Sequence, residues 1–135
     1  MTLSERIKAA RRVYIVGNGG SYANAIHLQN DLLGCGIRAY TLDPASLTRA
    51  ANDHGYEHVF ADWLDVVGER GDLLIALSGS GKSPNILRAI EVAERKGMDV
   101  HREFGSAQGF DMQAAEERQI WLGHELMREL KRCAL

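Results

Sequence analysis

Cysteine and proline are scarce in this sequence, with two residues of each among 135. Cys35 and Cys133 do not have the spacing of a metal-binding or redox motif. We therefore expect two free thiols rather than a disulfide, which is typical of a reducing compartment. This predicts a cytoplasmic protein.

The sequence also lacks long apolar runs and a strong excess of charge of either sign. No stretch approaches the roughly 20 apolar residues that span a membrane, and the run at 13–16 is too short for a signal peptide. The formal net charge is −2, so we expect neither a nucleic-acid nor a membrane partner. A chain of this length, with 45% hydrophobic residues, is long enough for one domain with its own core, and we take residues 1–135 as that domain.

Short apolar runs alternate with amphipathic stretches along the first hundred residues. The runs at 13–16, 37–42 and 73–77 predict buried strands. The stretches at 3–10, from the glycine-rich turn to about 33, at 56–67 and at 85–96 predict helices, and 45–55 predicts a helix or a loop. This order predicts an α/β fold with three αβα layers around a parallel sheet.

The alternation breaks after residue 97. Residues 98–100 begin like a fourth strand, but His101, Arg102 and Glu103 follow, and a central parallel strand would not carry them. A loop at 104–112 and a last helix at 114–132 complete the expected pattern. We therefore expect a sheet of three to four strands.

The stretch from Asp72 to Pro84 has the pattern of an anion-binding loop. An apolar run is followed by a turn rich in serine and glycine, and a helix begins at Pro84. Free backbone N–H groups and the positive end of the helix dipole favour an anion at such a turn. A similar loop, Gly17-Asn18-Gly19-Gly20-Ser21, follows the first predicted strand.

Two nucleotide-binding motifs are alternatives for these loops. Residues 76–83 fit a loose P-loop with Ala76 in place of its first glycine, but no later strand ends in an aspartate suited to magnesium. Gly17-Asn18-Gly19 begins a dinucleotide fingerprint, but the third glycine is missing. We therefore expect no nucleotide cofactor.

Taken together, the two loops resemble those of the sugar isomerase (SIS) domain family and, within it, the phosphoheptose isomerases. The resemblance runs from about residue 13 to 100 and returns in the last helix. It is carried by Gly17 to Ser21, Asn24-Ala25, His27, Ala51-Asn52-Asp53, Tyr56, Phe60, Gly71-Asp72, the loop from Ser78 to Ser83, and Gly123-His124.

The resemblance implies a phosphosugar site, whose predicted residues come from both loops and one later segment. The serine-rich loop would hold the phosphate, the first loop would assist, and a third segment would lie near the sugar. These residues are Ser78, Gly79, Ser80 and Ser83, then Asn18, Gly19, Gly20 and Ser21, then Asn52 and Asp53. Gly79 replaces a hydroxyl that many relatives carry, and we expect Lys82 to point to solvent.

The resemblance also implies a catalytic group that can hold one zinc ion. Its predicted ligands are His27, Asp31, Glu116 and His124, with Asp31 and His124 as the catalytic pair. His27 and Asp31, four residues apart, share a helix face. Eight residues of helix span about 12 Å, so Glu116 can join His124 at one ion only from the start of the last helix.

The predicted reaction is the isomerisation of sedoheptulose 7-phosphate to a manno-heptose 7-phosphate through an enediol. The alternative is a non-catalytic module that binds a phosphosugar or another protein. The sequence is shorter than these isomerases before the first strand and before the last helix. We expect a homo-oligomer, dimer or tetramer, with the site at a subunit interface.

Overall fold

The computed structural model describes residues 1–102 and 111–134, with side chains up to 131. Its centre is a parallel sheet of four strands in the order β2-β1-β3-β4. The strands are β1 (Val13–Gly17), β2 (Ala39–Thr41), β3 (Leu73–Leu77) and β4 (Asp99–His101). The predicted short parallel sheet is confirmed, and most of the expected loop at 104–112 lies outside the described residues.

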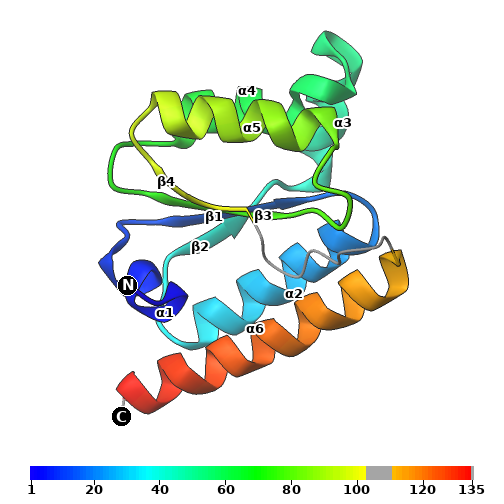
Figure 1. Ribbon diagram of the computed structural model, residues 1–135. Helices are drawn as coiled ribbons and strands as arrows, with labels where there is room; N and C mark the ends of the chain where they lie inside the picture. The colour runs from blue at the N-terminus through cyan, green and yellow to red at the C-terminus, as the bar shows by residue number, and fades with distance from the viewer. Residues whose placement is uncertain (103–110, 135) are drawn as a thin grey trace.

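Helices cover both faces of the sheet, which gives the three predicted layers (Figure 1). One layer holds α1 (Leu3–Ala9), α2 (Gly20–Gly34) and α6 (Met112–Ala134). The other holds α3 (Pro44–His54), α4 (Val59–Val67) and α5 (Pro84–Arg95), with a 3-10 turn at Tyr56–His58 before α4.

The two central strands, β1 and β3, are buried along their full length, which is why they read as continuous apolar runs. Alternate side chains of β1 serve opposite cores. Val13 and Ile15 pack with α1, α2 and α6, whereas Tyr14 and Val16 pack with α3, α4 and α5. These β1 side chains thus fix both helix layers to the sheet.

Local signals set two helix starts. Thr2 and Glu5 form a capping box at α1. Asp43 accepts a hydrogen bond from the Ser46 N–H and Pro44 occupies the first turn of α3. The segment for which the sequence allows either a helix or a loop is therefore a helix.

The predicted helix at 56–67 begins later, at Val59. Tyr56 does not belong to its packed face: the side chain is 51% exposed, and its hydroxyl donates to Asn18 Oδ1 at 2.8 Å. The 3-10 turn breaks the regular spacing because it places Tyr56 toward the first loop instead of the core.

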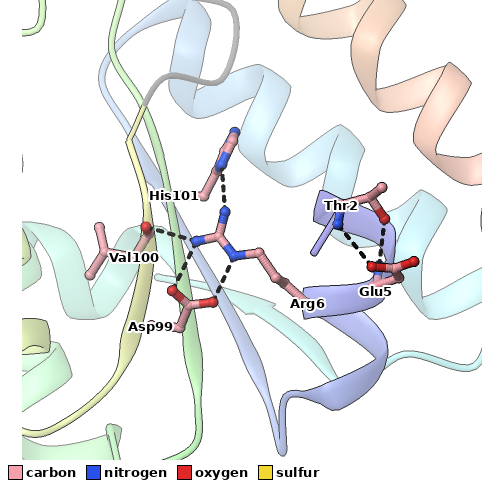
Figure 2. A network of polar contacts seen from close by, with 6 residues as sticks. All are labelled: Thr2, Glu5, Arg6, Asp99, Val100 and His101. Carbon is pink, nitrogen blue, oxygen red and sulfur yellow. Dashed lines mark hydrogen bonds and ion pairs between the residues drawn. The ribbon is translucent and has the colours of Figure 1, made fainter.

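β4 is an edge strand, which explains its ionisable residues (Figure 2). The Arg6 guanidinium of α1 binds both Asp99 carboxylate oxygens at 2.8 and 2.9 Å and donates to the Val100 carbonyl at 2.9 Å. A further guanidinium nitrogen lies 3.2 Å from His101 Nδ1. The hydrogen bond to Asp99 raises the pKa of Arg6, and the same bond lowers the pKa of Asp99.

Two further expectations concern the membrane and the thiols. Among the described residues, no helix combines the length and apolar character needed to cross a bilayer. Cys35 is a free thiol, as predicted; the Cys133 side chain lies outside the described part.

Candidate functional site

The two glycine-rich loops lie side by side at the carboxyl edge of the sheet. β1 and β3 are neighbours, with Gly17 in register with Leu77, so the loops that follow them leave the sheet together. After β1 the chain continues to β2 on one side of this pair, and after β3 it continues to β4 on the other side. Ligands in open α/β sheets bind at such a switch point.

A small pocket lies between the loops. Residues from both loops and from the first turn of α6 line it: Asn18, Ser21, Leu77, Ser78, Gly79, Ser80, Ser83 and Met112. The structure thus brings together most of the predicted phosphate residues, and the two others, Gly19 and Gly20, lie between Asn18 and Ser21 in the first loop. Lys82 is exposed, as expected.

The serines of the second loop are held by backbone donors. The Gly81 N–H donates to Ser78 Oγ at 3.0 Å, and the Lys82 N–H donates to Ser80 Oγ at 3.1 Å. Each hydroxyl accepts from the loop, so its own hydrogen is available to an acceptor in the pocket.

Asn18 of the first loop is held by two side chains, those of Asn85 and Tyr56. Its Oδ1 accepts from Asn85 Nδ2 at 2.8 Å and from the Tyr56 hydroxyl at 2.8 Å, and its Nδ2 donates to Asn85 Oδ1 at 2.9 Å. A carboxamide offers two donor hydrogens and two acceptor lone pairs. Both lone pairs are used, so only one N–H remains for a ligand.

The pocket therefore presents hydrogen-bond donors, and the N-terminus of α5 follows it at Pro84. Hydroxyl and amide donors beside a helix N-terminus suit a phosphate group. Sequence reasoning did not assign a role to Asn85, which is 2% exposed. The only signal in the sequence was an amide residue directly after Ser83-Pro84.

The first turns of α6 lie across both loops. A Cβ built on Gly79 would lie 2.7 Å from Met112 Sδ and 3.2 Å from Ala115 Cβ. A Cβ built on Gly20 would lie 2.3 Å from the Glu116 carboxyl carbon. A side chain at either position would have to displace the end of the Met112 or Glu116 side chain, so glycine leaves room for α6 to approach both loops.

A cluster of two imidazoles and a carboxylate lies farther along the seam between α2 and α6. The ligand atoms of His27, Asp31 and His124 all lie within 4.8 Å of one another. The two histidine Nε2 atoms are 3.0 Å apart, and Asp31 Oδ2 lies 3.3 Å from His27 Nε2 and 3.8 Å from His124 Nε2. The polar face of α2 therefore meets α6, not solvent alone.

This cluster can hold a metal ion. Asp31 is only 8% exposed, and its Oδ2 atom is buried and accepts no hydrogen bond from the described groups. A buried carboxylate oxygen of this kind calls for a cation. Ligands of tetrahedral zinc, at about 2.0–2.2 Å from the metal, lie about 3.4 Å apart, close to the spacing seen here.

The structure does not bring every predicted residue to these sites. The His27–Asp31–His124 cluster does not include Glu116. Glu116 lies inside α6, which begins at Met112, and its carboxyl group lies against Gly20. Asn52 and Asp53 are near the end of α3 and do not line the pocket, and Asp53 pairs with Arg49 at 3.7 Å. The ligand role of Glu116 and the sugar contacts of Asn52 and Asp53 stay predictions.

Comparison with known proteins relates this geometry to one family. The sequence model described as "SIS domain" matches residues 2–101. A phosphoheptose isomerase of Sodalis glossinidius is 41% identical over 105 residues, which cover 73% of this chain and 54% of that protein. The chain thus spans about half the length of the curated relatives it matches.

Solved structures share the fold. A phosphoheptose isomerase from Neisseria gonorrhoeae superposes with a TM-score of 0.84 at 26% identity, covering 96% of this chain and 81% of that one. The sugar isomerase domain of an RpiR transcription factor from Sphaerobacter thermophilus has a TM-score of 0.66 at 19% identity, covering 94% and 73%, and shows the fold alone. The match to the SIS model over most of the chain, the similar isomerase sequences and the shared fold show that this protein belongs to the SIS domain family.

Proposed function

We propose that the protein is a cytoplasmic phosphosugar isomerase that converts sedoheptulose 7-phosphate to a manno-heptose 7-phosphate. The similarity to phosphoheptose isomerases supports the substrate, and the free thiol of Cys35 supports the compartment.

One observation carries the proposal: α2 joins the phosphate pocket to the His27–Asp31–His124 cluster. Ser21 lines the pocket, and His27 follows six residues later on the same helix, about 9 Å along its axis. A sugar phosphate bound between them has its phosphate at one end and its reacting carbons at the other. This separation suits a substrate with several carbons between the two groups.

The reaction needs a base and a proton carrier. The ketose has its carbonyl at C2. Removal of a proton from C1 with protonation of O2 gives the enediol, and return of a proton to C2 with loss of the O1 proton gives the aldose. We assign the carbon-bound proton to the Asp31 carboxylate and, while no ion is bound there, the proton exchanged between O1 and O2 to His124 Nε2. Zinc held on His124 Nε2 would occupy the lone pair of that nitrogen, and it would assist the same exchange by polarising the substrate oxygens.

The test is incubation with sedoheptulose 7-phosphate in D2O, followed by NMR with and without added zinc. We expect an aldose product and deuterium at the reacting carbon, and a loss of about 10²–10⁴ in rate for Asp31→Asn. His54→Ala, at an exposed histidine of α3, is the control and should keep full activity. No product and no exchange under either condition would reject the isomerase.

The alternative is a non-catalytic module that binds a phosphosugar. In that case the substrate would bind, with broadened or shifted resonances, and no deuterium would enter the sugar.

We also propose that His27, Asp31 and His124 hold one zinc ion with a position left open for substrate, as catalytic zinc sites do. We expect about one zinc per chain in untagged protein, and a small fraction of that in His124→Ala. His54→Ala is again the control, since His54 also pairs with an acid, Asp62, at 2.6 Å. Equal zinc content in His124→Ala and the wild type would contradict the site.

Finally, we propose a homo-oligomer with this site near a subunit interface. The α2 and α6 layer supports it, because both helices expose large apolar side chains. On α2, Ile26 is 43% and Leu33 is 51% exposed, and on α6, Ile120 is 40% and Trp121 is 61% exposed. Exposed apolar surface of this kind is typical of a contact with a partner.

A further inference from the structure

Gln119 is a buried carboxamide on α6, with 2% of its surface exposed. It lies within the predicted last helix, but the sequence analysis assigned it no role. Burial of an amide is costly unless its polar atoms are hydrogen-bonded, and here both ends have partners on α2. Its position is therefore specified by α2.

The two contacts of Gln119 have a fixed direction. Its Oε1 accepts from Asn24 Nδ2 at 2.8 Å, and that same Nδ2 also donates to the Glu116 carbonyl at 3.0 Å. Because Asn24 offers hydrogens on that side, the Gln119 oxygen must face it. The Gln119 Nε2 is then left to donate to Ser21 Oγ, at 3.1 Å.

Ser21 is thereby made an acceptor toward α6. Its hydroxyl has one hydrogen and two lone pairs, and a lone pair is occupied by Gln119. Ser21 is itself 2% exposed and lines the pocket between the loops. Its hydrogen is consequently free to point to a ligand there.

We propose that Gln119 is a positioning residue: it directs the Ser21 hydroxyl hydrogen to the phosphate group of the ligand. This rests on the proposed function, since it requires that the pocket bind phosphate. It gives α6 a second task besides carrying His124, and it acts through Ser21 rather than by contact with the ligand.

The test is a double-mutant cycle on the affinity for inorganic phosphate, measured on the full chain by titration calorimetry or phosphorus NMR. Gln119→Met keeps length and removes both polar atoms. We expect about tenfold weaker binding in Ser21→Ala, which corresponds to about 1.4 kcal/mol, and about three- to tenfold in Gln119→Met. The Ser21→Ala/Gln119→Met variant should bind no more weakly than Ser21→Ala.

A second variant keeps Gln119 and reverses its direction. In Asn24→Asp, a carboxylate faces Gln119, so the amide should turn its Nε2 to that new carboxylate and its oxygen to Ser21. The Ser21 hydrogen would then be drawn to α6, and phosphate binding should weaken as in Ser21→Ala, with little further loss in the Ser21→Ala background. Gln113→Met, at an exposed glutamine of the same helix, is the matched control and should bind as the wild type.

The outcomes separate the two proposals. Wild-type protein that fails to bind phosphate overturns the proposed function and this inference with it. Wild-type binding with an unchanged affinity in Gln119→Met, or with losses that add in full to those of Ser21→Ala, overturns this inference alone. If Gln119→Met does not fold, the Asn24→Asp cycle decides in the same way.

Discussion

Gly79 shows how one missing side chain shapes the site. The family resemblance places a hydroxyl side chain at this position, and the structure gives a packing reason for glycine. Met112 and Ala115 of α6 occupy the space that a Cβ would take. The glycine therefore lets the last helix reach the pocket.

We predict that Gly79→Ala lowers the free energy of unfolding by about 1 kcal/mol, the low end of the cost of overpacking, because Met112 must turn aside and Ala115 must shift slightly. Met112→Ala in the same chain should recover part of the loss, since it removes the nearest atoms. Urea denaturation measures both. Gly34→Ala is the control, because a Cβ there would meet nothing within 4 Å; a Gly79→Ala protein as stable as this control would contradict the contact.

The site residues were only partly predictable from the sequence, and the reason is local. His27 and Asp31 share a helix face by spacing alone, so that pair was expected without a structure. Their proximity to His124 depends on how α6 packs against α2. The residue pattern of neither helix predicts that packing. Gln119 was missed because a single amide on a largely charged helix resembles a solvated residue.

At the scale of the elements, the Arg6 side chain joins α1 to β4 through its hydrogen bonds to Asp99 and Val100 (Figure 2). The pKa of Asp99 lies below its ordinary value because Arg6 binds the ionised carboxylate. The contribution of this pair to stability is therefore present at pH values above the pKa of an aspartate in the unfolded chain, about 3.9. It is lost as the pH falls through the lower pKa of the folded protein.

We predict that Asp99→Asn destabilises the protein near neutral pH by about 0.2–1 kcal/mol, the range of exposed ion pairs, since the Asp99 side chain is 50% exposed. The difference from the wild type should vanish well below about pH 4. Urea titrations across this range test it. Asp65→Asn, which removes a single contact at 3.1 Å from Arg95, should cost less; a pH-independent effect of Asp99→Asn would count against the pair.

Elements were predicted well where burial leaves an unbroken apolar pattern. The continuous apolar runs of β1 and β3 identified central strands because both faces are buried. α3 was ambiguous because its signal lies in the cap: Asp43 and Pro44 resemble the end of a strand, whereas they begin the helix. β4 is a strand despite its charges because Arg6 accommodates them at an edge.

At the scale of the whole molecule, the α2 and α6 layer exposes large apolar side chains, and the proposed self-association would cover them. We predict an oligomer in light scattering at micromolar concentration, and a shift toward monomer in Trp121→Glu, because a charge on Trp121, 61% exposed, would have to be buried in the contact. Val66→Glu is the control, at an 83% exposed residue of α4 in the other layer. A wild-type monomer would reject the oligomer, and equal dissociation of both variants would reject this face.

The docking of α6 also has a consequence for the order of folding events. The contacts that complete the site join residues 97 and 98 positions apart, His27 with His124 and Ser21 with Gln119. Such long-range contacts form slowly compared with the local ones. We expect them to form after the rate-limiting step, so in stopped-flow experiments phosphate should slow unfolding and leave the refolding rate almost unchanged. The nascent chain would then gain its ligand only once the last helix is in place.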